Sequence, residues 1–294
     1  MDSFITEFGL NRKQISLPQT SLRIAAAQAQ PIPGDVAANI ARTVELTGIA
    51  ADRGAKLVVF PEKFLSGYEP DLIACDPAKY AFDANDPRLA PIREVCRRRE
   101  IAVIVGAATR ATAGLRISSL IFNRSGEQIE PYHKQYLYSS EARIYHPGTQ
   151  GHMLVLDGWR LAAGVCYDSG FPEHARLAAV NGAHAYLVSA LFSMKTGFHQ
   201  SRIWFPARAF DNTLYVLLSN HAGTTGGWEA CGASAIWNPY GDVMVQASRD
   251  RDEVITALLD PALLADIRER ETVLADFNAR GDVIPGGYTV QSLD

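Results

Sequence analysis

The sequence predicts an α/β fold in which two β-sheets pack face to face and helices lie outside them. Short apolar runs typical of buried strands alternate with amphipathic helical patterns along the chain. The alternation occurs in two similar halves, each with its own group of strands. No Gly/Ser-rich or Pro-rich linker separates the halves, which indicates one domain of mixed α/β type.

A βαβ unit is predicted at the start of the first half. LRIAAAQAQ, which begins at Leu22, is typical of a buried strand, and DVAANIARTVELTGIAADRGA is typical of an amphipathic helix. KLVVFPE is a second apolar strand that ends on the carboxylate of Glu62. A helix over residues 91–100 and a strand over residues 101–107 follow.

Hairpins and a second alternation complete the pattern. The turn RSGE separates strands predicted at 115–123 and 128–132, and an Asp-Gly turn separates strands at 153–156 and 159–166. Alternating helices and strands come next, followed by a hairpin around NPYGD; they are predicted at 172–181 (helix), 185–189 (strand), 198–212 (helix) and 214–219 (strand). Each half therefore supplies one sheet.

Composition argues against several classes of partner. Of the 294 residues, 47% are apolar and 20% are charged, as in a compact soluble globule. The net charge of -4 and the pI near 6.0 provide no basic field for nucleic acid or an anionic membrane. Arg97, Arg98 and Arg99 fit a solvated helix face. We therefore predict binding to neither nucleic acid nor membrane.

The cysteines and the chain ends bear on compartment and boundaries. The four cysteines lie far apart with no CxxC pair, so neither disulfides nor a zinc site is predicted and a reducing cytoplasm fits best. MDSFITEFGLNRKQISLPQTS lacks the features of a signal peptide, and no other window approaches a membrane span. We predict an N-terminal arm over 1–20, the domain over 21–275 and an irregular C-terminal tail over 276–294, either frayed or crossing to a neighbouring subunit.

Cys166 stands where the apolar run 161–165 stops and an Ala-rich helical pattern begins. A single cysteine is more often a small buried hydrophobe than a nucleophile. A strand-to-helix junction, however, aims backbone N–H groups and the positive end of a helix at the sulfur, which favours the thiolate and can also hold an oxyanion. On this residue alone, both interpretations stay open.

A cysteine nucleophile needs a base to take its proton. Of the seven histidines, His133 comes closest to a suitable strand end, whereas His146, His174 and His199 fit loop or helix-surface positions. Glu62 is better placed after LVVF, because partial burial there raises the pKa of a carboxyl group toward the working pH. The alternative role of Glu62 is that of a structural, salt-bridged glutamate.

Lys134 and Glu141 form a second candidate pair. Lys134 follows a strand, where a buried ammonium would stabilise negative charge developing on a carbonyl oxygen, although surface lysines are commoner. Glu141 would hold Lys134 charged and oriented, which offsets the cost of its burial. Neither signal is specific by itself.

Taken in order, these residues make the sequence resemble the nitrilase superfamily, the carbon–nitrogen hydrolases. FPEKFLSGYEP resembles the family's glutamate motif, HKQYLYSSEARIYHPG its lysine motif, GVCYDSGFPEHAR its cysteine motif, and NHAGTTGGWEACGASAIWNPYG its closing pattern. The resemblance extends from about Leu22 to about Asp260. It implies a four-layer αββα sandwich with two central mixed β-sheets, a homodimer or larger homo-oligomer, a small-molecule substrate, no metal and no organic cofactor.

The resemblance also implies a role for each residue. Cys166 is expected as the nucleophile and Glu62 as general base and acid. Lys134 is expected to hold the oxyanion together with the backbone N–H of Tyr167, while Glu141 positions Lys134 and the substrate. The expected reaction is hydrolysis of a non-peptide carbon–nitrogen bond in a small linear amide or N-carbamoyl compound through a cysteine thioester, with release of ammonia or an amine.

Several features bear on the substrate. CYD resembles the amidase and carbamoylase branches rather than true nitrilases, whose cysteine is typically followed by Trp-Glu. Gly170 stands where many relatives carry arginine, and His221 stands at the arginine of the usual Asn-Arg-Val-Gly. Four aromatic residues are candidates for lining an apolar cleft, although core packing is their commoner role: Tyr68, Tyr138, Phe192 and Trp228.

Three alternatives to the amidase hypothesis remain. The protein is a nitrilase acting on a small nitrile, or a catalytically silent interaction module with the same fold. Retention of all four polar residues argues against the silent module. A redox-sensing role for Cys166 ranks last, because no resolving cysteine lies near it in the sequence.

Overall fold

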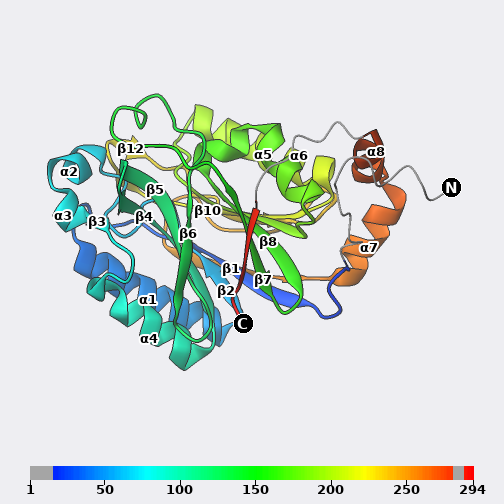
Figure 1. The fold of residues 1–294 in the computed structure, drawn as a ribbon, viewed down its shortest axis with the longest axis horizontal. Helices are drawn as coiled ribbons and strands as arrows, with labels where there is room; N and C mark the ends of the chain where they lie inside the picture. The colour runs from blue at the N-terminus through cyan, green and yellow to red at the C-terminus, as the bar shows by residue number, and fades with distance from the viewer. Residues whose placement is uncertain (1–15, 281–287) are drawn as a thin grey trace.

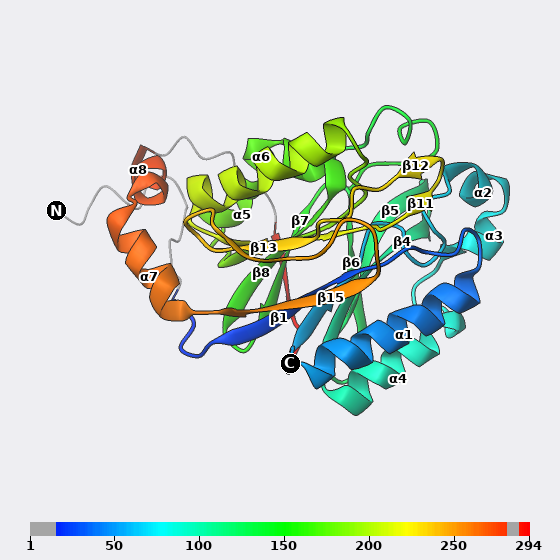
Figure 2. The same cartoon turned by 180° about the vertical axis from the view of Figure 1, so that it is seen from behind.

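The computed structural model describes residues 16–280 and 288–294, whose strands build two seven-stranded sheets and a small hairpin (Figures 1 and 2). The first sheet has the order β15-β1-β2-β4-β5-β6, with β3 beside β4. Its strands are β15 (Glu253–Leu259), β1 (Leu22–Gln28), β2 (Leu57–Val59), β3 (Ala81–Phe82), β4 (Ala102–Ala111), β5 (Gly114–Phe122) and β6 (Gln128–His133).

The second sheet has the order β14-β13-β10-β9-β8-β7-β16. Its strands are β14 (Val243–Gln246), β13 (Ala235–Trp237), β10 (Tyr215–Asn220), β9 (Ala185–Ala190), β8 (Trp159–Val165), β7 (Gly151–Leu156) and β16 (Tyr288–Ser292). Both sheets are mixed: β1 is parallel to β2 and antiparallel to β15, and β8 is parallel to β9 and antiparallel to β7.

Helices cover the outer face of each sheet (Figure 2). α1 (Val36–Asp52) and α4 (Ala90–Arg99) lie on the first sheet, and α5 (Pro172–Val180) and α6 (Thr196–Asn212) lie on the second. The remaining elements are α2 (Pro70–Cys75), α3 (Pro77–Tyr80), η1 (Pro87–Leu89), η2 (Cys166–Gly170), α7 (Pro261–Arg270), α8 (Val273–Arg280) and the β11 (Thr224–Thr225) and β12 (Trp228–Glu229) hairpin. The predicted four-layer αββα sandwich is confirmed.

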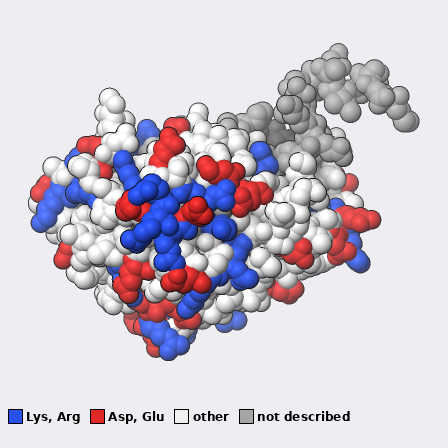
Figure 3. Space-filling view, turned by 90° about the horizontal axis from the view of Figure 1, so that it is seen from below, with Lys and Arg blue, Asp and Glu red and all other residues white. Residues whose placement is uncertain are grey.

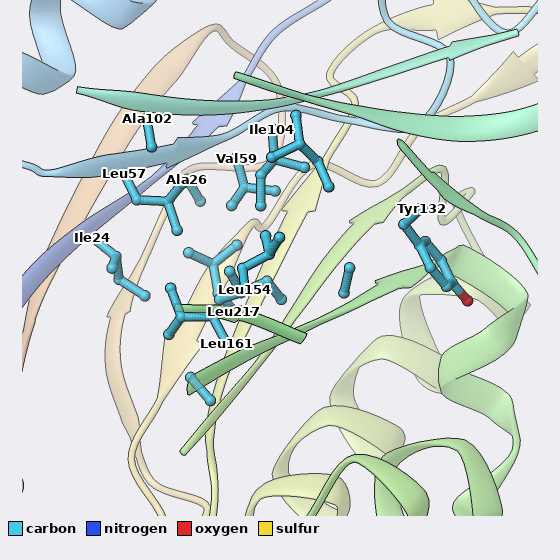
Figure 4. Packing of buried hydrophobic residues seen from close by; sticks show 14 of the residues in the cluster. Ile24, Ala26, Leu57, Val59, Ala102, Ile104, Tyr132, Leu154, Leu161 and Leu217 are labelled. Carbon is cyan, nitrogen blue, oxygen red and sulfur yellow. The ribbon is translucent and has the colours of Figure 1, made fainter. Parts of the chain in front are cut away.

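The central strands are apolar on both faces because each sheet is covered on both sides. In β1, Ile24 belongs to the core between the sheets, whereas the next residue, Ala25, packs under the outer helices. Figure 4 shows the inner core, in which Ile24 and Val59 of the first sheet lie toward Leu161 and Leu217 of the second. This double burial explains why the strands appear in the sequence as continuous apolar runs.

Two parts of the chain differ from the sequence prediction. Strand β15 was not anticipated, although it pairs with the whole of β1. The tail over 276–294 was expected to be irregular, but α8 extends to Arg280 and β16 pairs in parallel with β7, so that prediction is wrong for these residues. An unpaired β7 edge would expose backbone hydrogen-bonding groups, which β16 covers. Most of the predicted N-terminal arm, residues 1–15, lies outside the described residues.

Charges of both signs are interleaved on the α1 and α4 layer, which Figure 3 shows from below. Arg97 pairs with Glu94 at 2.8 Å, and Arg99 pairs with Asp52 of α1. The prediction of a solvated arginine face on α4 is confirmed. Within residues 16–280 and 288–294, every helix is too short or too polar to cross a bilayer.

Candidate active site

Glu62 lies in a tight turn after β2. The strand ends at Val59, so the carboxylate stands beyond it rather than at its last position. The turn rests against β4: a Cβ atom at Gly106 would lie 2.2 Å from the carbonyl oxygen of Pro61 and 2.4 Å from the backbone nitrogen of Lys63. Because glycine carries no Cβ, Gly106 lets the Glu62 turn lie directly on the sheet.

Lys134 and Glu141 meet Glu62 in a buried ion cluster. Lys134 follows β6, and its Nζ donates to Glu62 Oε1 at 2.8 Å and to the two carboxylate oxygens of Glu141 at 2.9 and 2.7 Å. Glu141 also accepts from the backbone N–H of Tyr138 at 2.8 Å and from the hydroxyl of Tyr68 at 2.5 Å. The fold thus brings three of the predicted site residues into direct contact.

The two carboxylates of the cluster differ in their ease of ionisation. Burial raises the pKa of Glu62, and the charge of Lys134 offsets only part of this effect. Burial also opposes ionisation of Glu141, but Lys134 and Lys63 outweigh it and lower the pKa of Glu141 to about 2. Glu62 Oε2 has no hydrogen-bond partner among the described residues. Glu62 is therefore the carboxylate suited to exchange a proton.

The Lys134 ammonium stays charged in this setting. Burial alone would lower the pKa of Lys134, but the negative charges of Glu62 and Glu141 raise it well above its ordinary value. A permanently charged donor in a buried site interacts strongly with negative charge that develops nearby.

Cys166 occupies a backbone elbow between β8 and η2. Its φ angle is 45°, a left-handed conformation that is uncommon for residues other than glycine. The residue is half-buried, and its Sγ donates to the carbonyl oxygen of Leu191 at 3.5 Å. Burial raises the pKa of Cys166 well above its ordinary value, and the charge of Glu62 raises it further. Burial of Cys166 and the charge of Glu62 thus oppose the thiolate that the elbow was expected to favour.

Asp168 is a buried carboxylate that sequence reasoning missed. Its Oδ2 accepts from the backbone N–H of Val165 at 2.9 Å and from the hydroxyl of Tyr132 at 2.6 Å. Its Oδ1 accepts from the backbone N–H groups of Gln135 and Tyr136 at 3.1 and 2.8 Å. Asp168 thereby ties the cysteine elbow to the loop that carries Lys134. The only sign of Asp168 in the sequence was its place in CYD, two residues after Cys166.

The altered Asn-His-Ala-Gly segment, residues 220–223, is hydrogen-bonded to the backbone of the Glu62 turn. His221 Nε2 donates to the backbone carbonyl of Glu62 at 2.6 Å, and the imidazole is fully buried. Asn220 Oδ1 accepts from the backbone N–H of Phe192 at 2.8 Å, which fixes the segment after β9. His221 therefore holds the Glu62 turn by its backbone.

Gly170, the second departure from the family pattern, is enclosed by other side chains. A Cβ atom there would lie 3.0 Å from the ring of Trp204. Arg208 donates to the backbone carbonyls of Ser169 and Gly170, at 3.0 Å each. A larger residue at this position would have to displace the Trp204 ring.

The aromatic candidates lie in three different settings. Tyr68 belongs to the ion cluster, and Tyr138 packs edge-on against Tyr167 with a centroid distance of 5.5 Å. Phe192 packs in the core beneath α6, and Trp228 is exposed on the β11–β12 hairpin. Tyr68 therefore contacts Glu141, and Tyr138 contacts Tyr167.

His133 and Lys63 differ in their distance from the ion cluster. His133 Nδ1 is bonded to the hydroxyl of Ser118 at 2.7 Å, away from the ion cluster. Sequence reasoning missed Lys63, whose side chain is fully buried beside Glu62; the only signal was its place in FPEK. Among the described residues, no group of three or more His, Cys, Asp or Glu side chains is gathered to hold a metal ion.

A four-layer sandwich with a Glu-Lys-Glu cluster beside a cysteine elbow is the arrangement that the resemblance to the carbon–nitrogen hydrolases predicts. The family model described as Carbon-nitrogen hydrolase matches residues 23–269, so the chain belongs to this family. The protein is an enzyme of the nitrilase superfamily and belongs to its amidase branch.

Curated relatives and solved structures are similar over most of the chain. A protein named "Hydrolase in pqqF 5'region" from Pseudomonas protegens is 32% identical over 87% of this chain and 89% of its own length. The chloroplastic omega-amidase of Arabidopsis thaliana is 29% identical over 90% of this chain and 74% of its own length. A variant of the amidase from Nesterenkonia sp. AN1, solved in complex with butyramide, aligns with a TM-score of 0.75 and 27% identity, covering 89% of this chain and 98% of that one.

Proposed function

We propose that the protein hydrolyses a small linear amide or N-carbamoyl compound through a thioester on Cys166, releasing ammonia or an amine. The observation that best supports this proposal is the contrast between the two carboxylates beside Cys166. Lys134 makes one contact to Glu62 and two to Glu141, which leaves Glu62 Oε2 without a partner among the described residues. Glu62 therefore combines a raised pKa with a free oxygen, as a proton carrier requires.

The first half-reaction forms the thioester. As Sγ of Cys166 attacks the carbonyl carbon, Glu62 takes the thiol proton, and the electron pair of the C=O bond moves to oxygen. The Lys134 ammonium and the backbone N–H of Tyr167 hold the oxyanion. The intermediate then collapses: Glu62 gives its proton to the nitrogen, the carbon–nitrogen bond breaks, and ammonia or an amine leaves.

The second half-reaction restores the enzyme. Glu62 takes a proton from water, and the resulting hydroxide attacks the thioester carbon. When this intermediate collapses, the carbon–sulfur bond breaks, the sulfur recovers a proton from Glu62, and the carboxylic acid product leaves. Because burial raises the pKa of Cys166 and so favours a thiol at rest, the mechanism needs a base for the sulfur, and one carboxylate serves as base and acid in both half-reactions.

Aromatic packing around the elbow supports a small substrate with an apolar part. Tyr167 packs edge-on against Phe171 at a centroid distance of 5.1 Å, and Tyr136 stacks on Phe171 at 3.7 Å. These rings line a surface pocket of about 460 Å³ that is formed by residues 135–137 and 142–147 together with Tyr167 and Phe171. The butyramide complex of the Nesterenkonia amidase supports short aliphatic amides as first substrates to test.

The test measures ammonia release from short amides, N-carbamoyl compounds and nitriles, with acyl-enzyme detected by intact mass after acid quench. We expect release from amides or N-carbamoyl compounds and an acyl group on the peptide that contains Cys166. Cys166→Ala should remain folded and lose turnover, whereas Cys75→Ala, which changes an exposed cysteine, should keep it. Turnover by Cys166→Ala, or release from nitriles alone, would refute the proposal.

We also propose that the chain forms a homodimer or larger homo-oligomer in a reducing cytoplasm. Ile203 and Phe210, two turns apart on α6, are 64% and 43% exposed, which is unfavourable for large apolar side chains left in water. Light scattering should give at least twice the chain mass of 32.1 kDa. A monomer at micromolar concentration would contradict the proposal.

A further inference from the structure

Lys63 is a buried cation that the mechanism above does not use. It directly follows Glu62, adopts a φ angle of 50°, and its side chain is fully buried. Its Nζ has no hydrogen-bond partner among the described residues. The same atom lies 3.4 Å from the ring centroid of Tyr68 and 4.9 Å from that of Tyr145. The aromatic faces attract an ammonium but do not replace hydrogen bonds lost from water.

The titratable groups around Lys63 are those of the candidate active site. They come from the Glu62 turn, the loop after β6 and the cysteine elbow, and comprise Glu62, Tyr68, Lys134, Glu141, Tyr145 and Cys166. His221, after β10, faces it from the second sheet and is kept neutral, because burial lowers its pKa to about 4. With Lys63 protonated, two ammonium groups balance two carboxylates; with Lys63 neutral, the cluster carries one net negative charge.

We propose that Lys63 is a positioning residue whose ammonium balances the second carboxylate of the cluster. Lys134 is largely committed to Glu141, so a second cation is needed if Glu62 is to be ionised before it accepts the thiol proton. The same charge favours the oxyanion that forms beside the cluster. The inference rests on the proposed function, because it assigns Lys63 a part in the proton transfers of that mechanism.

Burial brings the pKa of Lys63 closer to neutral pH. Burial lowers the pKa of Lys63 to about 8, although the charges of Glu141 and Glu62 oppose this shift. The ammonium is therefore present below about pH 8 and is lost as the pH rises through that value. While present, it lowers the pKa of Glu62 and widens the pH range in which the base is ionised.

The test compares the pH dependence of kcat/KM on a neutral amide for wild type, Lys63→Met and Lys63→Arg. Met has similar length and no charge. We expect Lys63→Met to move the acid limb of the profile upward by about one pH unit, as loss of one charge a few ångströms away implies. We also expect it to lower kcat at least about tenfold without a matching change in KM, as loss of transition-state stabilisation predicts. Lys63→Arg should restore part of both effects.

A matched control separates charge from general damage. Lys56→Met removes an exposed lysine just before β2 and should leave the profile unchanged. A folded Lys63→Met enzyme with the wild-type profile would overturn the proposal. If Lys63→Met does not fold, a lysine ¹³Cε titration of wild type, assigned with Lys63→Arg, decides: Lys63 titrating between pH 7 and 9 supports the proposal, and a neutral Lys63 at pH 7 overturns it.

A readout without turnover distinguishes failure of this inference from failure of the proposed function. The rate at which iodoacetamide alkylates Cys166 is measured against pH in a Cys75→Ser background. Lys63→Met should slow alkylation at pH 7, because loss of a cation disfavours the thiolate. If no amide is turned over but Lys63→Met still slows the alkylation of Cys166, the substrate assignment is rejected and the role of Lys63 is retained. Normal turnover with unchanged alkylation and an unchanged pH profile would reject the role of Lys63 alone.

Discussion

Replacing Asp168 by asparagine should weaken both the fold and the active site. The carboxylate accepts hydrogen bonds from three backbone N–H groups and from the Tyr132 hydroxyl, and its side chain is fully buried. Asparagine has the same shape, but it offers one oxygen where the carboxylate offers two. If the amide oxygen keeps the Gln135 and Tyr136 N–H groups, the amide nitrogen must face the N–H of Val165.

The expected loss can be built from the individual contacts. Hydrogen bonds to a charged acceptor contribute about 1.5–3 kcal/mol each, and a buried donor left without a partner costs about 1–3 kcal/mol. One backbone donor is orphaned by Asp168→Asn, and the retained bonds lose their ionic character, while relief from burying a charge offsets part of the loss. We expect the free energy of unfolding to fall by about 3 kcal/mol.

Urea denaturation at pH 7, followed by circular dichroism, measures this change. Asp83→Asn is the control, because Asp83 pairs with Arg110 at the surface, where ion pairs contribute about 0–1 kcal/mol. We also expect kcat/KM of Asp168→Asn to fall at least about 100-fold, as a displacement near 1 Å implies. A stability loss below about 1 kcal/mol together with near-normal turnover would refute the role assigned to these four contacts.

Three further predictions concern packing and pH. Gly106→Ala should lower the free energy of unfolding by about 1–3 kcal/mol and remove most activity, because its Cβ would overlap backbone atoms of the Glu62 turn. The control Gly48→Ala lies in open space on α1 and should raise the melting temperature. Full activity in Gly106→Ala would contradict this prediction. Burial lowers the pKa of His184 to about 3, so the stability that the neutral imidazole contributes is present above pH 6.5 and is lost as the pH falls. We expect the free energy of unfolding, measured by urea titration, to be about 2 kcal/mol lower at pH 5. The same dependence on pH in His184→Asn would exclude His184 as the cause. Because the pKa of Glu62 is raised by burial, kcat/KM should fall on the acid side at a pH above the ordinary glutamate pKa of 4.5, and an acid limb below 4.5 would rule out Glu62 as the titrating base.

The sequence by itself determined the architecture and the positions of the proposed reacting groups. Alternating apolar strands and amphipathic helices predicted two covered sheets, because burial on both faces of a strand leaves a continuous apolar run in the chain. Motif order placed Glu62, Lys134, Glu141 and Cys166 at the ends of strands or in the loops that follow them, where the fold does hold them.

Only the tertiary structure decided strand partners and the electrostatic state of the site. Strand β15 pairs with β1, and β16 with β7, across long stretches of sequence, and periodicity reports burial of a strand but not the identity of its neighbour. The raised pKa of Cys166, the bridging contacts of Asp168 and the charge on Lys63 depend on groups brought together from both sheets. A pKa is set by burial and nearby charges in space, and residues distant in sequence supply both.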